Sequence, residues 1–288
     1  MDANEYEYVK KEILAATAVD LDFYKAPQMQ RRLKSYLLRS GKPDWQSFFR
    51  MVRADDDARR DLKNYLTINV SSFFRDIDKY TFLKEKILPE LLSEKIAAPP
   101  RPKSLRDMRR SGRASAAIDT KTRGLRIWSA GCSRGQEPYS LAMLLTELSG
   151  SFTKHYILAS DLDRSALAYA EAGGPYTKDD VGAVSEKYLQ QYFEERDGKY
   201  FVKETLRRKV TFVQHNMLTD AFETDFDLIV CRNVVIYFTA EVKDKLYRRF
   251  YQSLRPGGIL FVGGTEIISK ASEIGFESAG ISFYRRKV

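Results

Sequence analysis

Cysteine and histidine are scarce in this sequence, and long apolar runs are absent. The 288 residues include 2 cysteines and 2 histidines. Cys132 and Cys231 are too few for a disulfide framework and lack the spacing of a zinc site, which favours a reducing compartment and no bound metal. No apolar run approaches the ~18 residues that span a bilayer, and the acidic start MDANEYEYVKKEI is unlike a signal peptide. We therefore expect a cytoplasmic protein without membrane insertion.

Acidic residues are fewer than basic ones, which leaves a net charge of +9 at pH 7. The excess lies in residues 95–126, with 10 basic and 2 acidic side chains, whereas residues 1–94 carry 17 and 16 and residues 127–288 carry 21 and 21. This segment is rich in proline and poor in large apolar residues, so we predict a basic linker over residues 95–124. Its charges either keep a spacer solvated or attract an acidic partner.

Hydrophobic patterning differs on the two sides of this linker. Residues 1–94 place apolar side chains at helical spacing, as in Val9, Ile13 and Ala16, so we predict a small all-helical domain. Residues 125–288 alternate short β-rich runs with helical stretches, which predicts an α/β fold with a parallel sheet covered on both faces. The runs expected to form this sheet are 126–130, 155–160, 210–215, 226–231 and 258–263.

Two features depart from this alternation. The pair Asp197–Gly198 separates QYFEER from KYFVKE, and Asp-Gly between β-rich runs is a strong hairpin signal. The last run, ISFYRRK, is expected to form an edge strand.

Glycines and carboxylates follow the predicted strands where ligands of open α/β sheets bind. Gly131 and Gly135 follow the first strand in a spacing that matches neither the dinucleotide fingerprint nor a P-loop, so pyrophosphate binding is disfavoured. Glu137 opens the next helix and either complements the helix dipole or contacts a cationic ligand. Asp161 ends the second strand, where a carboxylate can accept both ribose hydroxyl hydrogens. The alternative is that Asp161 or Asp163 caps the following helix.

Two further strand ends carry asparagine. Asn216 follows the third strand and Asn233 the fourth, so both would face the same crevice as Gly131. They suit hydrogen bonds to an adenine edge and an amino-acid moiety, although loop asparagines are often only turn formers. Upstream, the segment TINVSSFFR at residues 67–75 is expected to be an interdomain loop packed by Phe73 and Phe74.

In this order the motifs resemble those of the CheR-type chemotaxis receptor methyltransferases. The matching segments are 69–75, 128–142, 161–163, 231–238, 256–258 and 264–266. The resemblance covers the chain except residues 97–124. It implies a Rossmann-like class I methyltransferase sheet in a catalytic domain over residues 125–288, with a small antiparallel β-subdomain near residues 190–212. It also implies a receptor-recognition role for the helical domain over residues 1–94.

The resemblance further implies a cofactor and a reaction. S-adenosyl-L-methionine would give its methyl group to the γ-carboxylate of glutamates in methyl-accepting chemotaxis receptors and leave as S-adenosyl-L-homocysteine. Arg75 and Tyr237 match catalytic positions next to the reacting methyl. Cofactor-binding residues, including the glycine turn, fall on Asn69, Ser71, Arg75, Gly131, Glu137, Asp161, Asn216, Met217, Asn233 and Val234.

A glutamate-rich acceptor helix calls for a basic docking surface. The best candidate is the amphipathic segment that begins at residue 28, and the alternative is a merely solvated face. Its proposed substrate-binding residues are Arg31, Arg32, Lys34 and Arg39. We expect a monomer that is recruited to membrane receptor arrays through the cytoplasmic helical bundles of the receptors.

The histidine content agrees with this chemistry. A glutamate carboxylate is already ionised near neutral pH, so methyl transfer to it needs no general base. His155 and His215 lack a serine–histidine–aspartate arrangement and are expected to be structural.

Two other functions remain open. A nucleic-acid methyltransferase would suit the basic charge, but this chain has Arg-Asn-Val-Val-Ile-Tyr at residues 232–237, where amino-group methylases carry an Asn/Asp-Pro-Pro-Tyr/Phe element. We therefore expect no nucleic-acid partner. The other alternative is a regulatory module that binds the cofactor without turnover.

Overall fold

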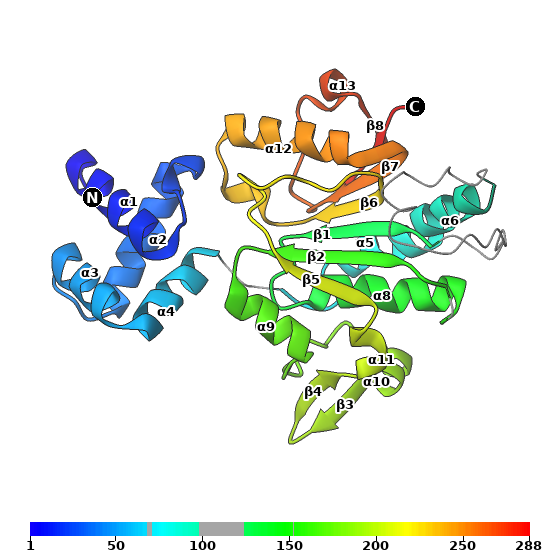
Figure 1. Ribbon diagram of the computed structural model, residues 1–288, viewed down its shortest axis with the longest axis horizontal. Helices are drawn as coiled ribbons and strands as arrows, with labels where there is room; N and C mark the ends of the chain where they lie inside the picture. Colours follow the sequence, from blue (N-terminus) through cyan, green and yellow to red (C-terminus); the bar gives the residue numbers. More distant parts are fainter. Residues whose placement is uncertain (68–70, 98–123, 152) are drawn as a thin grey trace, which may run out of the picture.

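The computed structural model describes residues 1–67, 71–97, 124–151 and 153–288 (Figure 1). Asn69 and almost all of the predicted linker lie outside the described residues. The chain begins with a helical domain, which stands to one side of a larger α/β domain in Figure 1. Its helices are α1 (Ala3–Thr17), α2 (Ala26–Arg39), α3 (Trp45–Ala54) and α4 (Asp56–Thr67), with a short 3₁₀ turn at Leu21–Phe23.

Local signals explain where two of these helices begin. Asp2 accepts the backbone N–H of Glu5 at 2.8 Å before α1, and Asp44 accepts that of Ser47 at 2.7 Å before α3. Such caps satisfy donors that the first helical turn leaves unpaired. The buried faces of the helices meet in one core, which confirms the predicted all-helical domain. Its largest members are Trp45, Phe48 and Phe49.

The larger domain contains a seven-stranded sheet in the order β5-β2-β1-β6-β7-β9-β8. The first five strands in this order are parallel, and β9 runs antiparallel to both β7 and β8. This arrangement confirms the predicted α/β class. The strands are β1 (Arg126–Ala130), β2 (Tyr156–Asp161), β5 (Val210–Gln214), β6 (Phe226–Cys231), β7 (Leu254–Val262), β8 (Phe276–Gly280) and β9 (Phe283–Arg286).

Helices cover both faces of this sheet (Figure 1). Along β1, Ile127 enters the core beneath helix α8, whereas the next residue, Trp128, enters the core beneath helix α12. Successive side chains of a strand point to opposite faces, so a fully buried strand carries apolar residues at every position. The covering helices are α8 (Gln136–Ser149) and α9 (Arg164–Ala172) on one face and α12 (Ala240–Ser253) on the other, with α13 (Ala271–Ile274) before β8.

The hairpin prediction is confirmed, and the prediction for the last strand is wrong. Strands β3 (Phe193–Arg196) and β4 (Lys199–Val202) pair antiparallel around Asp197 and Gly198, between helices α10 (Glu186–Tyr192) and α11 (Glu204–Arg207). Strand β9 is not an edge strand, because β8 pairs with its outer side. The β8 sequence, FESAG, is polar and small, which hides it from hydrophobic pattern analysis.

Three helical segments just before the linker pack on the sheet domain rather than on the helical domain. They are α5 (Ile77–Phe82), a π-helical stretch (Leu83–Ile87) and α6 (Leu88–Ala97). Tyr80, Leu83 and Leu91 belong to the same core as α8, whereas the core of the helical domain ends at Leu66. We therefore place the division between the domains after α4, and not at residue 94 as first expected.

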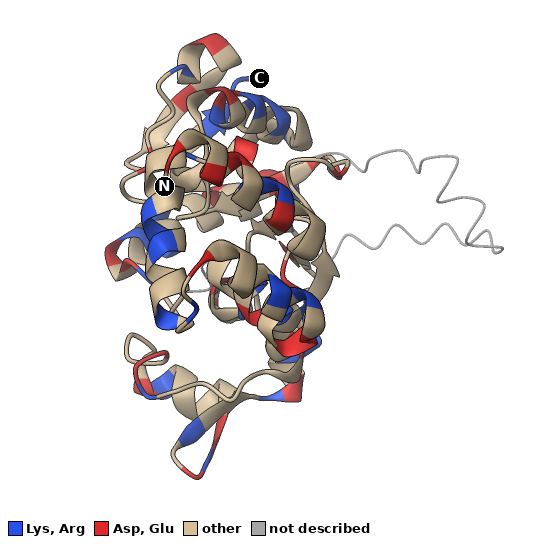
Figure 2. Cartoon of the chain, turned by 90° about the vertical axis from the view of Figure 1, so that its left-hand side faces the viewer, with Lys and Arg blue, Asp and Glu red and all other residues tan. Residues whose placement is uncertain are grey.

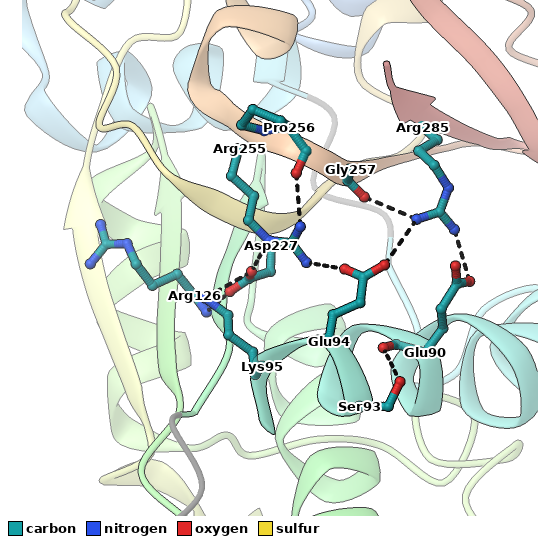
Figure 3. A network of polar contacts seen from close by, with 10 residues as sticks. All are labelled: Glu90, Ser93, Glu94, Lys95, Arg126, Asp227, Arg255, Pro256, Gly257 and Arg285. Atoms are coloured by element: carbon teal, nitrogen blue, oxygen red, sulfur yellow. Dashed lines mark hydrogen bonds and ion pairs between the residues drawn. The ribbon is translucent and has the colours of Figure 1, made fainter. Parts of the chain in front are cut away.

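An ion-pair network fixes α6 to the end of the sheet opposite the ligand-binding edge (Figure 3). Asp227, at the start of β6, is fully buried and accepts the backbone N–H of Arg126 at 2.7 Å. The same carboxylate pairs with Lys95 at 2.9 Å and with Arg255. No helix among the described residues has the length and apolar character needed to cross a membrane.

Candidate functional site

A cleft opens between the carboxyl ends of the parallel strands and the helical domain. It holds about 1010 Å³ of space, part of which is open solvent. Every predicted catalytic and cofactor-binding residue that the structure describes lines this cleft, while Asn69 lies outside the described residues. These residues are Ser71, Arg75, Gly131, Glu137, Asp161, Asn216, Met217, Asn233, Val234 and Tyr237.

The floor of the cleft is the turn after β1. The backbone N–H groups of Gly131 and Cys132 donate to the carbonyl of Ser160 at 2.8 and 2.9 Å, which ties this turn to the end of β2. Gly131 has φ +83°, and a Cβ atom on it would lie 2.6 Å from Cγ2 of Val234. Glycine therefore provides both the left-handed backbone and the close approach of this turn to Val234.

The two aspartates after β2 have different roles. Asp163 caps α9 by accepting the backbone N–H of Ser165 at 2.8 Å. Asp161 instead lines the cleft, and its two oxygens accept the N–H groups of Ser133 at 2.8 Å and Asp163 at 3.0 Å. Burial raises the pKa of Asp161, partly offset by these hydrogen bonds. Each carboxylate oxygen retains acceptor capacity for a ligand hydroxyl.

Glu137 has a position that suits both of the roles considered for it. It lies in the first turn of α8, where the helix dipole favours an anion. Its side chain also faces the cleft, accepts the hydroxyl of Ser129 at 2.7 Å and lies 3.9 Å from the guanidinium of Arg232. Burial raises the pKa of Glu137, and Arg232 opposes that shift. A buried carboxylate with incomplete neutralisation suits a cationic ligand.

A tight turn brings Arg75 to the cleft. Phe73 and Phe74 are buried, and the N–H of Phe74 donates to the hydroxyl of Ser140 in helix α8 at 3.1 Å. Phe74 and Asp76 have φ values of +50° and +60°, so left-handed residues flank Arg75 on both sides. Such backbone conformations are costly for residues other than glycine and persist only where packing holds them.

Arg232 supports this turn from below, a role that the sequence did not reveal. Its buried guanidinium donates to the carbonyl of Arg75 at 2.8 Å and pairs with Asp76. It also lies over the ring of Phe261, 4.8 Å from the centroid. Arg232 belongs to the matching segment 231–238. The sequence alone does not show whether the side chain of a charged residue directly after a buried strand points into the protein or to solvent.

The two asparagines also differ. Asn216 lines the cleft and accepts the N–H of Leu218 at 3.0 Å, so it is a turn former and a candidate ligand contact together. Asn233 adopts φ +59°, and its N–H donates to Glu266 at 3.1 Å. Glu266 also accepts the N–H of Gly263 at 2.6 Å, so this buried carboxylate shapes the loop that presents Asn233.

The helical domain completes the cleft wall. Tyr24 lines the cleft, and its ring packs edge-on against Phe238 with centroids 5.1 Å apart. Backbone hydrogen bonds join the domains on both sides of this pair, from Lys25 to the Tyr237 carbonyl at 3.0 Å and from Thr239 to the Phe23 carbonyl at 3.0 Å. Tyr237, in the short 3₁₀ turn Val235–Tyr237, is thus held between the domains. No sequence motif pointed to Tyr24 as a residue of the cleft.

The proposed docking residues on α2 lie outside the cleft and are not equivalent. Arg31, Lys34 and Arg39 are exposed. Arg32 is partly buried, stacks over the Tyr65 ring at 4.8 Å and donates to the Tyr65 carbonyl. Figure 2, which views the molecule from the side of the helical domain, shows that basic and acidic residues both occur on these helices. The basic character is therefore a property of α2 rather than of the whole domain.

The cleft fits an adenosyl ligand with a cationic amino-acid part. Three buried polar atoms of its lining residues, Ser133 Oγ, His215 Nδ1 and Arg232 Nε, have no hydrogen-bond partner within the described part of the chain. Buried polar groups normally find a partner, so these atoms suggest ligand contacts. Asp161 suits a ribose and Glu137 a positive charge, while Met217 and Val234 supply apolar surface.

Comparisons with known proteins agree with this geometry. The all-alpha domain of the CheR methyltransferases matches residues 4–67, and their SAM binding domain matches residues 69–284. The chemotaxis protein methyltransferase of Listeria monocytogenes is 36% identical to this chain, over 97% of this chain and 96% of its own length. That of Listeria innocua is 35% identical over the same shares, and a probable chemotaxis protein methyltransferase of Rhizobium etli is 32% identical over 95% and 96%. The chain therefore belongs to the CheR family of chemotaxis protein methyltransferases.

Proposed function

We propose that this chain transfers the methyl group of S-adenosyl-L-methionine to the γ-carboxylate of specific glutamates in methyl-accepting chemotaxis receptors. The products would be glutamate methyl esters and S-adenosyl-L-homocysteine. One observation supports the proposal above all others: Arg75 and Tyr237 line the same cleft as Gly131, Glu137 and Asp161. Residues suited to a cofactor and residues suited to an incoming carboxylate thus share one site.

In this proposal the sheet edge binds the cofactor. Asp161 accepts the ribose hydroxyls, Glu137 faces the positively charged part of the ligand, and Asn216 and Asn233 offer amides to the adenine edge and the amino-acid moiety. Gly131 lets the backbone turn closely against Val234, and Met217 and Val234 supply apolar contacts. When bound, the cofactor would supply a methyl group activated by its sulfonium.

The protein's contribution to the reaction is then orientation rather than proton transfer. The glutamate of the substrate is ionised near neutral pH, so no general base is required. Arg75 holds the incoming carboxylate or the cofactor, and Tyr237 places its hydroxyl near the reacting centre. Holding two reactants in line can supply ~7–11 kcal/mol of the barrier. The contacts between Tyr24 and Phe238 shield this region from water on the side of the helical domain.

The acceptor would dock on α2. Arg31, Lys34 and Arg39 are exposed there and suit the acidic surface of a receptor helix bundle. Recruitment to receptor arrays follows from this docking and remains part of the proposal.

The test offers three acceptors in parallel. Purified protein is incubated with methyl-tritiated S-adenosyl-L-methionine and a receptor cytoplasmic fragment, DNA or RNA from the same cells. We expect label on glutamates of the receptor fragment, located by peptide mapping. Label on DNA or RNA would support the nucleic-acid alternative, and cofactor binding without label on any acceptor would support a regulatory module. Arg75→Ala is expected to lower transfer strongly, and normal turnover with normal cofactor affinity in this variant would contradict the role given to Arg75.

A further inference from the structure

The helical domain is joined by side chains to the loop that follows β2. Asn64, on α4, is half-buried, and its amide nitrogen donates to Oδ2 of Asp163 at 2.7 Å. An ionised carboxylate can only accept hydrogen bonds, so the amide presents its N–H₂ group here. The hydroxyl of Thr67, three residues further along α4, lies 3.3 Å from the same carboxylate oxygen. Two side chains of α4 therefore meet one carboxylate of the sheet domain.

Asp163 uses its two oxygens for different purposes. Its Oδ1 atom caps α9 by accepting the N–H groups of Ser165 at 2.8 Å and Ala166 at 3.3 Å. A cap of this kind needs only one oxygen. Asp163 is 1% exposed, so water cannot satisfy the second oxygen, and the amide of Asn64 does so instead. Asp163 is thus both a helix cap and a junction between the domains.

A chain of contacts leads from this junction into the cleft. The N–H of Asp163 donates to Oδ1 of Asp161 at 3.0 Å, and Asp161 lines the cleft. Leu162, between the two aspartates, packs against the core of the helical domain. The end of α4 also reaches the cleft, where Leu66 and Thr67 belong to the lining. The position of α4 therefore bears on each residue of the loop from Asp161 to Asp163.

The orientation of the Asp161 carboxylate depends on two backbone donors. One is the N–H of Ser133 at 2.8 Å, and the other is the N–H of Asp163. An acceptor that is already fixed loses little conformational freedom when a ligand binds, so preorganisation of this kind raises affinity. If Asp163 moved, Asp161 would lose one of the two donors. The cost would appear as weaker binding of a ligand that donates to Asp161.

We propose that Asn64 and Asp163 are positioning residues for the cofactor, joined across the two domains so that the helical domain holds Asp161 in place for the ribose. This inference deepens the proposed function and rests on the ribose contact proposed for Asp161. Neither residue touches the reacting atoms, so the pair sets the affinity for the cofactor rather than the rate of transfer. The helical domain, proposed to recognise the receptor, then also contributes to the cofactor site.

The test changes the charge at the junction. Asn64→Asp places a second carboxylate against Asp163, and we expect the affinity for S-adenosyl-L-homocysteine to fall about tenfold in isothermal titration. Asn64→Ala removes the hydrogen bond without adding a charge and should lower the affinity about threefold. The turnover number with saturating S-adenosyl-L-methionine should stay at the wild-type value in both variants. The matched control is Asn4→Asp, which makes the same change at an exposed position of α1 and should leave the affinity unchanged.

A double variant tests whether the pair itself is responsible. N64D/D163N exchanges donor and acceptor: the new amide can donate to the new carboxylate while its oxygen still caps α9. The affinity should therefore return to within about twofold of the wild type. A loss in Asn64→Asp that N64D/D163N does not restore would overturn the proposal, as would a lower turnover number with unchanged affinity.

Asn64→Ala keeps the proposal testable if Asn64→Asp does not fold, which circular dichroism would show. Unchanged affinity in a folded Asn64→Ala protein would overturn the proposal. Asp161→Ala tests the ribose contact separately. If Asp161→Ala leaves the affinity unchanged, the ribose contact is wrong. If Asp161→Ala lowers the affinity and the Asn64 variants do not, only the coupling between the domains is wrong.

Discussion

Gly131 shows how strictly one position limits the cleft. A methyl group here would meet Val234 Cγ2 at 2.6 Å and Met217 Cε at 3.6 Å, both on the lining. We predict that Gly131→Ala weakens cofactor binding at least about tenfold, since the added carbon displaces Val234, which lines the cleft, and strains the turn. Isothermal titration with S-adenosyl-L-homocysteine measures the change.

The control for Gly131→Ala is Gly150→Ala. Gly150 has a similar φ of +79° and open space around the added Cβ. Its ψ is 163°, a conformation that costs other residues about 1–3 kcal/mol, so this change strains the backbone without displacing a residue of the cleft. It should lower stability and leave cofactor affinity intact. Equal affinities for the two variants would contradict the placement of the ligand against Gly131.

Glu137 makes cofactor affinity dependent on pH. Because burial raises its pKa above the ordinary value, part of the unbound protein carries a neutral Glu137 in mildly acidic solution. A raised pKa stabilises the unbound fold at low pH, and that contribution is lost as pH rises through the folded-state pKa. A cationic ligand favours the ionised form, so binding should release a proton and be weaker near about pH 5 than near about pH 7.

Titration calorimetry across this range in buffers of different ionisation enthalpy measures both the affinity and the released proton. Glu137→Gln should bind the cofactor more weakly and with a flatter pH dependence. The same pH dependence in Glu137→Gln as in the wild type would assign the effect to another group, such as Asp161, whose pKa burial also raises.

The sequence patterns and the family resemblance predicted the residues that line the cleft at the sheet edge. They did not predict the neighbouring residues that hold those lining residues in place. Asp161 and Gly131 follow strands directly, and the carboxyl ends of parallel strands meet at one edge, so their convergence could be foreseen. Arg232, Glu266 and Tyr24 could not, because their roles depend on which way a side chain turns after the backbone has folded. Which of Asp161 and Asp163 caps the helix and which lines the cleft likewise became clear only from the backbone at the start of α9.

At the scale of elements, Asp227 fixes α6 to the sheet (Figure 3). Its buried carboxylate accepts the N–H of Arg126 and pairs with Lys95 and Arg255. We predict that Asp227→Ala lowers the free energy of unfolding by about 3–5 kcal/mol, because it removes the carboxylate that Lys95 pairs with and leaves Arg255 with Glu94 alone. Urea denaturation followed by circular dichroism measures this loss.

Glu223 provides the comparison for Asp227. It pairs with Arg126 at 2.8 Å near the same end of the sheet, but its side chain is 48% exposed. Surface ion pairs contribute little, so Glu223→Ala should cost less than about 1 kcal/mol. Similar losses for the two variants would show that α6 is not held by the buried network.

The elements themselves were predicted unevenly. Runs such as RIWSA and FDLIVC hold apolar residues at adjacent positions, as in Ile127 and Trp128 or Leu228 to Val230, which is typical of strands buried on both faces. Strand β8 lacks such residues and was missed. Helices α5 and α6 were recognised as helices, but their amphipathic pattern cannot state which core receives the apolar face, so they were assigned to the domain that precedes them in sequence.

At the scale of the whole molecule, the segment that carries most of the net charge is not the helix proposed to dock the receptor. The net charge of +9 comes mostly from the predicted linker, which is outside the described residues, whereas α2 carries an exposed basic set. We predict that reversing Arg31 and Lys34 together to glutamate raises KM for a receptor fragment several-fold, because both charges face solvent where a partner would dock. Cofactor affinity should not change.

Arg50→Glu on exposed α3 is the control for charge reversal on the same domain. Arg32→Glu should differ from both of these variants by lowering stability. Arg32 donates to the Tyr65 carbonyl and stacks over the Tyr65 ring, so reversing its charge disturbs the fold. Equal loss of receptor methylation and cofactor binding in the Arg31 and Lys34 variant would point to misfolding and contradict a docking role for this face.

The central claim is that the cleft between the two domains makes glutamate methyl esters. The most direct measurement incubates the protein with methyl-tritiated S-adenosyl-L-methionine and a receptor cytoplasmic fragment, treats the labelled fragment with mild alkali and counts the volatile methanol. Carboxyl methyl esters hydrolyse in base, so the account predicts that nearly all of the label is released, and that the Arg75→Ala protein produces little. Label that stays on the fragment after alkali would contradict it.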